Sequence, residues 1–171
     1  MKPSITKQIE TGANIAIIVV ALLVVVTLVP RLWPGKSPQN PLASPPIAAG
    51  TRISLQGLDW KGSDQNLLLV LSTGCHFCSE SAPFYKRLVS EASINRKIRL
   101  IGVFPQDTAA ARQYLQQMQI PLETVVQVSL STIHVGGTPT LILVDGKGVA
   151  NKVWMGRLST DNENEVLNDL R

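Results

Sequence analysis

The only two cysteines of this 171-residue chain, Cys75 and Cys78, lie three positions apart in the segment STGCHFCSES. Cysteines with this C-x-x-C spacing occur in thiol-disulfide exchange, in metal sites and as structural crosslinks. Exchange requires one thiol that loses its proton readily and a second thiol within reach to resolve a mixed disulfide. The motif therefore leaves three hypotheses: a redox couple, half of a metal site, or a structural bridge.

The structural and metal hypotheses are the weaker two. A bridge that closes so short a loop restricts the unfolded chain by only about 2 kcal/mol. A structural zinc site uses four ligands, and the only other soft donors in the chain are His76 and His134. His76 lies between the two cysteines and is poorly placed to complete a tetrahedron with them. The redox couple is therefore the leading hypothesis, with a zinc or copper site as the alternative.

The sequence around the motif predicts that a strand meets a helix there. The run NLLLVLS, residues 66–72, is almost wholly apolar, as expected of a central strand buried on both faces. From Phe77 to about Ala92, apolar residues recur at helical spacing. Pro83 lies inside this predicted helix and is expected to kink it. The cysteines therefore lie where the strand ends and the helix begins.

This position assigns a role to each residue of the motif. Unpaired N–H groups and the helix dipole stabilise negative charge at a helix N-terminus. We therefore expect Cys75 to have a depressed pKa and to be the attacking thiolate. Cys78, one helical turn later, is close enough to resolve the mixed disulfide. A protonated His76 would favour the Cys75 thiolate further and shift the couple toward an oxidant.

The remaining elements complete an α/β pattern. They are a strand over 98–104, a helix over 108–119 capped by Asp107, strands over 140–144 and 149–154, and a terminal helix over 162–171. A DGKG turn joins the last two strands so tightly that they must be antiparallel. Thr160 and Glu163 have the spacing of a capping box for the terminal helix. The order β-α-β-α-β-β-α predicts a single α/β domain.

With these elements placed, residues 51–171 resemble the thioredoxin fold, and in particular the membrane-anchored redoxins of the TlpA and ResA type. The resemblance is carried by LLLVLS running into CHFC, by Pro83, by the strand RLIGVF and by the segment GGTPTLILVDGKGVANKVWMG. It implies a central mixed sheet flanked by helices and a protein thiol-disulfide oxidoreductase with no cofactor. It also implies that Pro139 is cis and packs beside the cysteines, and that Thr138 offers backbone hydrogen bonds to a bound polypeptide substrate.

The chain departs from the family pattern at two places. Gly74 stands where the family usually has Trp, so the aromatic wall of the substrate site is either absent or supplied by Phe77, the candidate substrate-binding aromatic. The strand before the motif has no buried carboxylate of the kind found in thioredoxins. The proton acceptor of Cys78 and the direction of exchange, reduction or oxidation, are therefore left open.

Two other functions were compared with the exchange hypothesis. A copper metallochaperone would bind copper(I) through Cys75, Cys78 and His134, but copper chaperones with this fold usually have C-x-x-x-C spacing. A peroxiredoxin-like peroxidase would need a P-x-x-x-[TS]-x-x-C pattern, and LVLSTGC precedes Cys75 instead. The spacing therefore favours exchange over both.

The N-terminal part of the chain predicts a membrane anchor. Gly12 to Val29 contains no charged residue, and as a helix it would rise about 27 Å, against a hydrocarbon core of about 30 Å. Trp33 falls where an interfacial aromatic belongs, and no small-residue cleavage site directly follows the apolar run. We predict a short tail over 1–11 and one uncleaved transmembrane helix over 12–33.

A proline-rich segment, residues 34–50, predicts a semi-rigid linker to the redoxin domain over 51–171. The formal net charge of +4 is scattered along the chain, which argues against a nucleic-acid partner. The family resemblance implies a cytoplasmic N-terminus, an extracytoplasmic or periplasmic domain, protein substrates and an upstream redox partner. A chain whose only cysteines form the motif suits an oxidising compartment.

Overall fold

The computed structural model describes Leu22 and residues 47–95 and 97–171. Over these residues, no helix has both the length and the apolar character needed to cross a membrane. The predicted tail over 1–11, the transmembrane helix over 12–33 apart from Leu22, and the linker up to residue 46 lie outside the described residues. The predicted anchor therefore stays a prediction.

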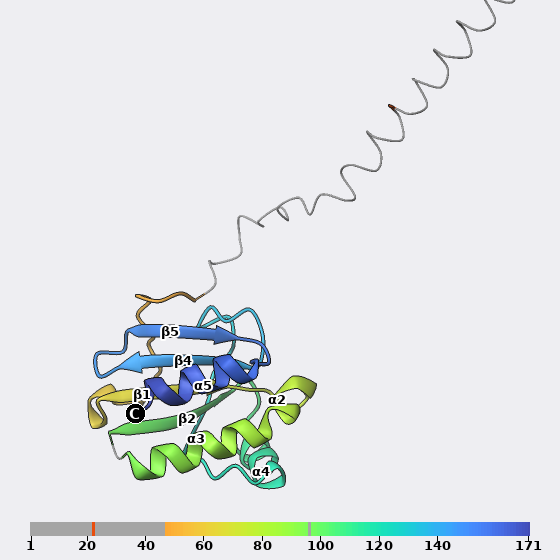
Figure 1. The fold of residues 1–171 in the computed structure, drawn as a ribbon, viewed down its shortest axis with the longest axis horizontal. Coiled ribbons are helices and arrows are strands. Elements are labelled where there is room, and N and C mark those ends of the chain that lie inside the picture. Colours follow the sequence, from red (N-terminus) through yellow and green to blue (C-terminus); the bar gives the residue numbers. More distant parts are fainter. Residues whose placement is uncertain (1–21, 23–46, 96) are drawn as a thin grey trace, which may run out of the picture. The chain divides into compact units, whose positions relative to one another are not determined.

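The described chain forms a mixed five-stranded sheet (Figure 1). Its strands are β1 (Gln65–Val70), β2 (Ile98–Phe104), β3 (Thr124–Gln127), β4 (Thr140–Asp145) and β5 (Ala150–Met155). They lie in the order β3-β2-β1-β4-β5. β1, β2 and β3 are parallel, whereas β4 is antiparallel to both of its neighbours, β1 and β5. β1 is thus the central strand, and its residues from Leu67 to Val70, together with Leu71 directly after it, are fully buried.

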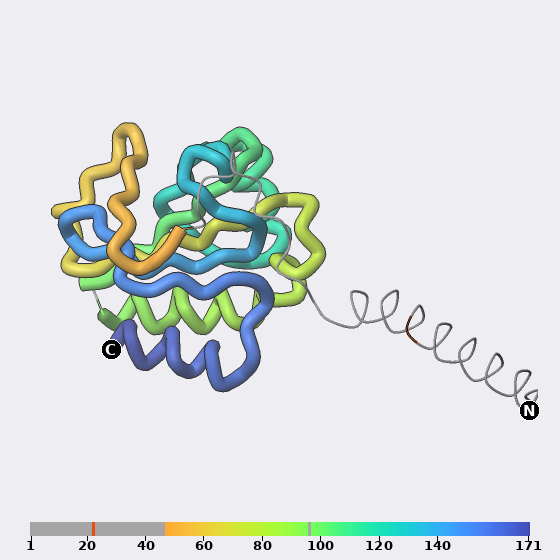
Figure 2. Tube along the Cα trace, turned by 90° about the horizontal axis from the view of Figure 1, so that it is seen from above, coloured from red at the N-terminus to blue at the C-terminus, as the bar shows by residue number. Residues whose placement is uncertain are grey.

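Helices cover one face of this sheet. They are α2 (His76–Glu80), α3 (Ala82–Ile94), α4 (Thr108–Met118) and α5 (Thr160–Asp169), and a short 3-10 helix, η1 (Trp60–Gly62), precedes β1. Figures 1 and 2 show α3 and α5 side by side on the same face of the sheet. Phe84, Leu88 and Val166 from these helices join Leu67 and Leu69 in one buried apolar cluster.

Irregular segments pack against the opposite face (Figure 2). Leu68, Val70 and Ile101 of the sheet pack there against two segments, 47–58 and 128–135. The apolar residues that these segments contribute are Ile47, Ile53, Leu55, Ile133 and Val135. Ile47, the first described residue of this fold, is already buried and donates a backbone hydrogen bond to the carbonyl of His134 (2.9 Å). The residues next to the predicted start of the domain at Thr51 are therefore part of its packing.

The structure agrees with the sequence for the strands over 98–104 and 140–144 and for the antiparallel hairpin that follows. Asp107 is the N-cap of α4, where its side chain accepts from the amide of Ala110 (2.9 Å). One strand, β3, was not predicted. It has four residues, and Val125 is its one buried residue, so the alternation that predicts a strand is too short to recognise.

Two helix predictions were wrong in detail. The helix expected over 77–92 is two helices, α2 and α3, that meet at Ser81. Pro83 lies in the first turn of α3, where a backbone N–H would have no acceptor within the helix. Its lack of an N–H therefore costs no helical hydrogen bond, and Pro83 stands at the start of a helix instead of kinking one. The N-cap of α5 is Ser159, which accepts from the amide of Asn162, and Thr160 is the first helical residue.

Candidate redox site

Cys75 and Cys78 form a disulfide at the start of α2, with an S–S distance of 2.34 Å and a Cα–Cα distance of 5.2 Å. The motif lies just after β1, at the end of a turn in which the Cys75 amide donates to the Ser72 carbonyl (3.1 Å). Cys75 is the N-cap of α2, and its Sγ accepts from the amide of Cys78 (3.1 Å). In the reduced protein this amide would stabilise a Cys75 thiolate.

The two cysteines differ in access to solvent. Cys78 is completely buried, whereas Cys75 is partly exposed. A substrate sulfur can therefore reach Cys75 from outside, while Cys78 can act only on a partner already joined to Cys75. This asymmetry agrees with the predicted roles of an attacking Cys75 and a resolving Cys78.

The loop before β4 lies against Cys75. The Thr138–Pro139 peptide bond is cis, as the family resemblance implies, and Pro139 is buried. The carbonyl oxygen of Thr138 lies 3.3 Å from Cys75 Sγ. Thr140 pairs with Val70 at the end of β1, which brings the loop to the edge of the sheet from which the motif starts. The structure therefore brings Thr138 and Pro139 to the cysteines, while their contact with a substrate stays a prediction.

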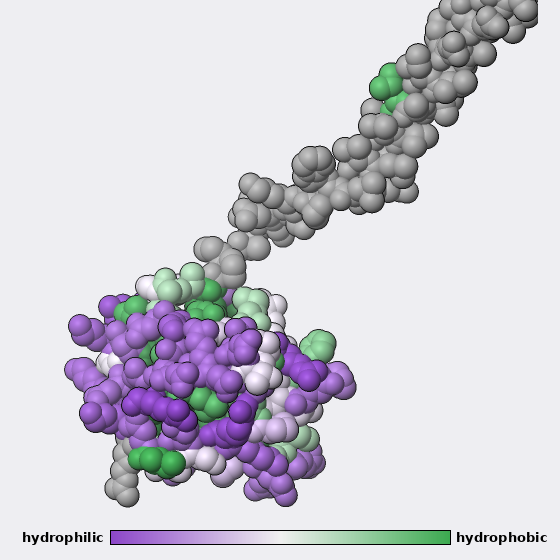
Figure 3. Space-filling view, viewed as in Figure 1, coloured by the Kyte–Doolittle hydropathy of each residue, from purple (hydrophilic) through white to green (hydrophobic). Residues whose placement is uncertain are grey.

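His76 and Phe77 point into solvent beside the disulfide. The side chain of His76 is 79% exposed and Phe77 is 54% exposed. Figure 3 shows light green apolar atoms that project next to α2 from a mostly hydrophilic face. An exposed aromatic at this place fits the predicted substrate contact of Phe77.

A carboxylate connects His76 to the far side of the site. Glu80 Oε1 lies 3.1 Å from His76 Nε2, and Glu80 Oε2 accepts from Arg157 Nη1 at 3.0 Å. Arg157 follows Gly156, whose amide donates to the carbonyl of Pro139 (2.8 Å). His76, which follows Cys75, is therefore part of a chain of contacts from α2 to the loop that carries the cis-proline.

Among the residues that the structure describes, no carboxylate side chain is buried. The buried polar side chains of the described chain belong to Asn66, Ser81 and Thr140. The buried hydroxyl of Tyr85 has no hydrogen-bond partner among the described residues, and the Ser81 hydroxyl donates to the Phe77 carbonyl (2.9 Å). Burial raises the pKa of Tyr85, which keeps this phenol neutral and unsuited as a base. The proton acceptor of Cys78 is therefore neither a carboxylate nor a tyrosinate of the core.

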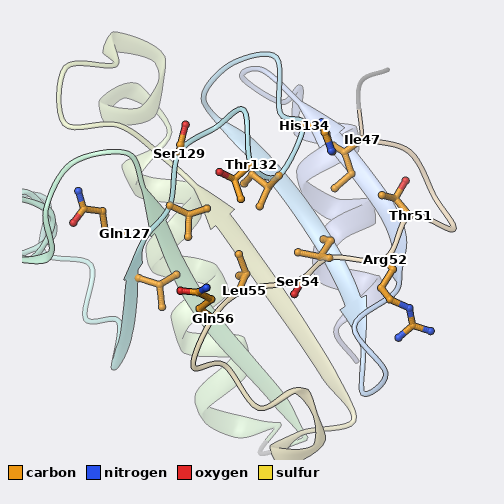
Figure 4. Close-up of a pocket in the computed structure, with 14 residues that line it drawn as sticks. Ile47, Thr51, Arg52, Ser54, Leu55, Gln56, Gln127, Ser129, Thr132 and His134 are labelled. Atoms are coloured by element: carbon orange, nitrogen blue, oxygen red, sulfur yellow. The ribbon is translucent and has the colours of Figure 1, made fainter. Parts of the chain in front are cut away.

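His134 lies on the other face of the sheet. Figure 4 shows it beside Ile47, at a groove of about 600 Å³ that residues of segments 47–56 and 126–134 line. Neither cysteine lines this groove. Over the part of the chain that the structure describes, no three His, Cys, Asp or Glu side chains are grouped to hold a metal ion. The copper site proposed from Cys75, Cys78 and His134 is therefore not favoured.

Sequence reasoning missed two residues next to the site. Met155, at the end of β5, is 52% exposed and pairs in register with Thr140, next to the cis-proline. Gln106, in the loop between β2 and α4, bonds to Ser72 and Thr73 just before the motif. The sequence could have indicated Met155, because it ends the strand that pairs with the strand following the GGTP segment. No sequence signal identifies Gln106, because its contact joins segments 33 residues apart.

Comparison with solved structures supports the assignment of the fold. The thioredoxin domain of a thiol-disulfide oxidoreductase from Bacteroides vulgatus superposes with a TM-score of 0.55 at 20% identity, over 73% of this chain and 99% of that one. The chain has the thioredoxin fold. The thiol:disulfide interchange protein DsbE from Chlorobium tepidum gives a TM-score of 0.53 at 24% identity, over 66% of this chain and 84% of that one. A thiol:disulfide interchange protein from Bacteroides sp. gives 0.53 at 20% identity, over 72% of this chain and 86% of that one.

At these identities the likeness concerns the fold, and function has to be argued from the site. No protein-family model and no curated protein sequence matches the chain. Within the thioredoxin fold, the C-x-x-C disulfide of this chain lies at the start of a helix that follows the central strand.

Proposed function

We propose that this protein is a thiol-disulfide oxidoreductase that exchanges disulfides with other proteins. One observation carries the proposal: a disulfide joins the partly exposed Cys75 to the buried Cys78 at the start of a helix, against the cis-Pro139 loop. A structural crosslink would not need one partly exposed cysteine next to the loop that carries the cis-proline. The solved structures of similar fold carry names of thiol-disulfide exchange proteins, which supports the same function.

The exchange follows from the two positions. The thiolate of reduced Cys75 attacks a substrate disulfide, so that one substrate sulfur leaves as a thiolate and the other forms a mixed disulfide with Cys75. Cys78 then loses its proton and attacks Cys75 Sγ, which restores the Cys75–Cys78 disulfide and releases the second substrate sulfur. Two electrons pass from the protein to the substrate. The reverse sequence transfers a disulfide to a substrate dithiol.

The surface around Cys75 suits an extended polypeptide. Two exposed apolar side chains lie near this part of the fold: Phe77 in α2 and Met155, which pairs in register with Thr140 next to the cis-proline. Apolar anchors of this kind bind polypeptides with little dependence on sequence. Protein thiols and disulfides are therefore the proposed substrates.

The proposal is tested by reduction of insulin disulfides with dithiothreitol and the purified full-length protein. The wild type is expected to accelerate the reaction, while the Cys75→Ser variant has no activity above background. A wild type no faster than Cys75→Ser, with both proteins folded by circular dichroism, would refute the proposed exchange.

We further propose that the protein is a membrane-tethered redoxin of the TlpA and ResA type. The uncharged run from Gly12 to Val29, followed by the proline-rich segment 34–50, supports a single-pass anchor with a spacer. The N-terminus would be cytoplasmic, with the redoxin domain on the extracytoplasmic side and an upstream redox partner that resets the cysteines. Restriction of both cysteines to the motif supports the oxidising side.

Location is tested by labelling with a membrane-impermeant maleimide in intact bacterial cells that express the reduced full-length chain. Cys75 is expected to react without permeabilisation, and the protein is expected to stay with the membrane after a carbonate wash. Labelling that occurs only after lysis would place the redoxin domain in the cytoplasm. Release of the protein by the carbonate wash would refute the proposed membrane anchor.

A further inference from the structure

Gln106 is the side chain through which a neighbouring loop holds the turn before Cys75. β1 and β2 remain hydrogen-bonded as far as the Leu71 amide, which donates to the Val103 carbonyl (2.9 Å). Beyond that bond the two chains separate. The half-buried Gln106 then bridges them, since its Nε2 donates to Ser72 Oγ (2.9 Å) and its Oε1 accepts from the Thr73 amide (3.4 Å).

The turn that Gln106 holds faces open space at Gly74. Gly74 is exposed, and a Cβ added to it would meet no atom within 4 Å, so no neighbouring side chain packs against the turn at that residue. The turn itself closes through the Cys75 amide and the Ser72 carbonyl (3.1 Å). The position of Ser72 relative to the sheet therefore determines where Cys75 begins α2.

The placement of Cys75 matters for its reactivity because two groups contact its sulfur. The Cys78 amide points at Sγ from 3.1 Å and stabilises a thiolate, whereas the Thr138 carbonyl oxygen at 3.3 Å does not. A small shift of Cys75 changes the balance between these contacts.

We propose that Gln106 is a positioning residue that fixes Cys75 for thiol-disulfide exchange. It acts through Ser72 and Thr73 and does not touch the reacting sulfur. This inference rests on the proposed exchange function and adds to it the group that holds the attacking cysteine in place.

The test measures the alkylation rate of Cys75 in the reduced full-length protein as a function of pH, with Cys78 changed to Ser in every variant. Gln106→Ala is expected to slow alkylation near pH 7 by about fivefold, because a weakened hydrogen bond from the backbone amide of residue 78 leaves less thiolate. The pH midpoint of the reaction should rise, and the Thr73 amide should exchange its hydrogen faster. Gln127→Ala is the matched control, since Gln127 Nε2 donates to the neighbouring Pro105 carbonyl (3.4 Å) and to neither Ser72 nor Thr73.

A double variant separates positioning from general loss of structure. If Gln106 acts through Ser72, then Ser72→Ala lowers the alkylation rate in the same direction, and the Ser72→Ala/Gln106→Ala protein is no slower than Gln106→Ala. Fully additive effects, or a Gln106→Ala rate within about twofold of the wild type across pH, would overturn the inference. Because alkylation needs no protein substrate, this result decides the role of Gln106 even if the wild type fails to reduce insulin.

Discussion

At the scale of single residues, the account depends on the different exposure of the two cysteines. Cys75 is partly exposed and contacts the Thr138 carbonyl, whereas Cys78 is fully buried. The position of the motif at the predicted start of a helix led to the prediction that Cys75 is the attacking cysteine. Sequence reasoning did not predict that Met155 would pair with Thr140 next to the cis-proline, or that Gln106 would bond to the turn before the motif, because both depend on how distant segments pack.

The first prediction concerns the resolving cysteine. In Cys78→Ser, a mixed disulfide between Cys75 and a protein substrate has no internal thiol to resolve it, so it should accumulate. Non-reducing electrophoresis after acid quenching should show these adducts for Cys78→Ser and none for Cys75→Ser. Equal adduct levels in both variants would mean that the assignment of attack to Cys75 is wrong.

The second prediction concerns His76. A charged imidazole next to Cys75 stabilises the thiolate and therefore the reduced protein. His76→Ala should shift the thiol-disulfide equilibrium toward the disulfide by about threefold, which lowers the midpoint reduction potential by about 15 mV. His134→Ala, an exposed histidine on the other face, should leave the midpoint unchanged. A rise in the midpoint of His76→Ala would exclude the proposed tuning.

At the scale of elements, local sequence signals predicted the strands that surround the motif but not all of the helix boundaries. Buried runs such as 66–72 and the DGKG turn are strong signals, and the strands and the hairpin appear where expected. The boundary between α2 and α3 at Ser81 and the N-cap of α5 at Ser159 depend on which residue is the first to adopt helical backbone angles. Neighbouring residues of similar type could cap the helix equally well, so the sequence does not identify the boundary. The segments 47–58 and 128–135, which pack on the face of the sheet opposite the helices, are irregular and show no periodic apolar pattern from which their packing could be predicted.

The third prediction concerns the turn between β4 and β5. Gly148 has φ +80°, and a Cβ there would lie 2.9 Å from Trp60 Nε1 and 3.2 Å from the Ile53 carbonyl oxygen. Gly148→Ala should therefore lower the free energy of unfolding by roughly 2–4 kcal/mol in urea titrations. Gly156 also has φ +80° but meets no atom within 4 Å, so Gly156→Ala should cost only about 1–2 kcal/mol. Equal losses would show that the contact with Trp60 does not matter.

The fourth prediction concerns the same turn and pH. Asp145 Oδ1 accepts from the amides of Val149 (2.9 Å) and Lys147 (2.8 Å), and these bonds hold the pKa of Asp145 below its usual value. A depressed pKa means that the stabilisation is present above the unfolded value of 3.8 and is lost as pH falls through the folded value.

Urea unfolding of the wild type and Asp145→Asn at several pH values tests this dependence. The wild type should be the more stable at neutral pH, and the difference between the two midpoints should shrink as pH falls below about 4. A difference that stays constant down to the lowest pH would mean that the Asp145 charge contributes nothing to the turn.

At the scale of the whole molecule, a thioredoxin fold presents one C-x-x-C pair at the carboxyl end of its central strand. The fold was predictable because the order of elements, the motif and the TP step before β4 agree with one another. Direction of exchange was not predictable, since the midpoint depends on small differences in thiolate stabilisation among His76, Glu80, Arg157 and the Cys78 amide.

The measurement that tests the central claim most directly is a redox titration of the full-length protein in glutathione and dithiothreitol buffers, with Cys75 and Cys78 followed by alkylation mass shift. We predict one reversible two-electron transition that Cys75→Ser abolishes. A midpoint near about −120 mV would make the protein a thiol oxidant, and one below about −250 mV a reductant. A pair that resists alkylation until a chelator is added, or that never changes state between the buffers, would contradict the redox account.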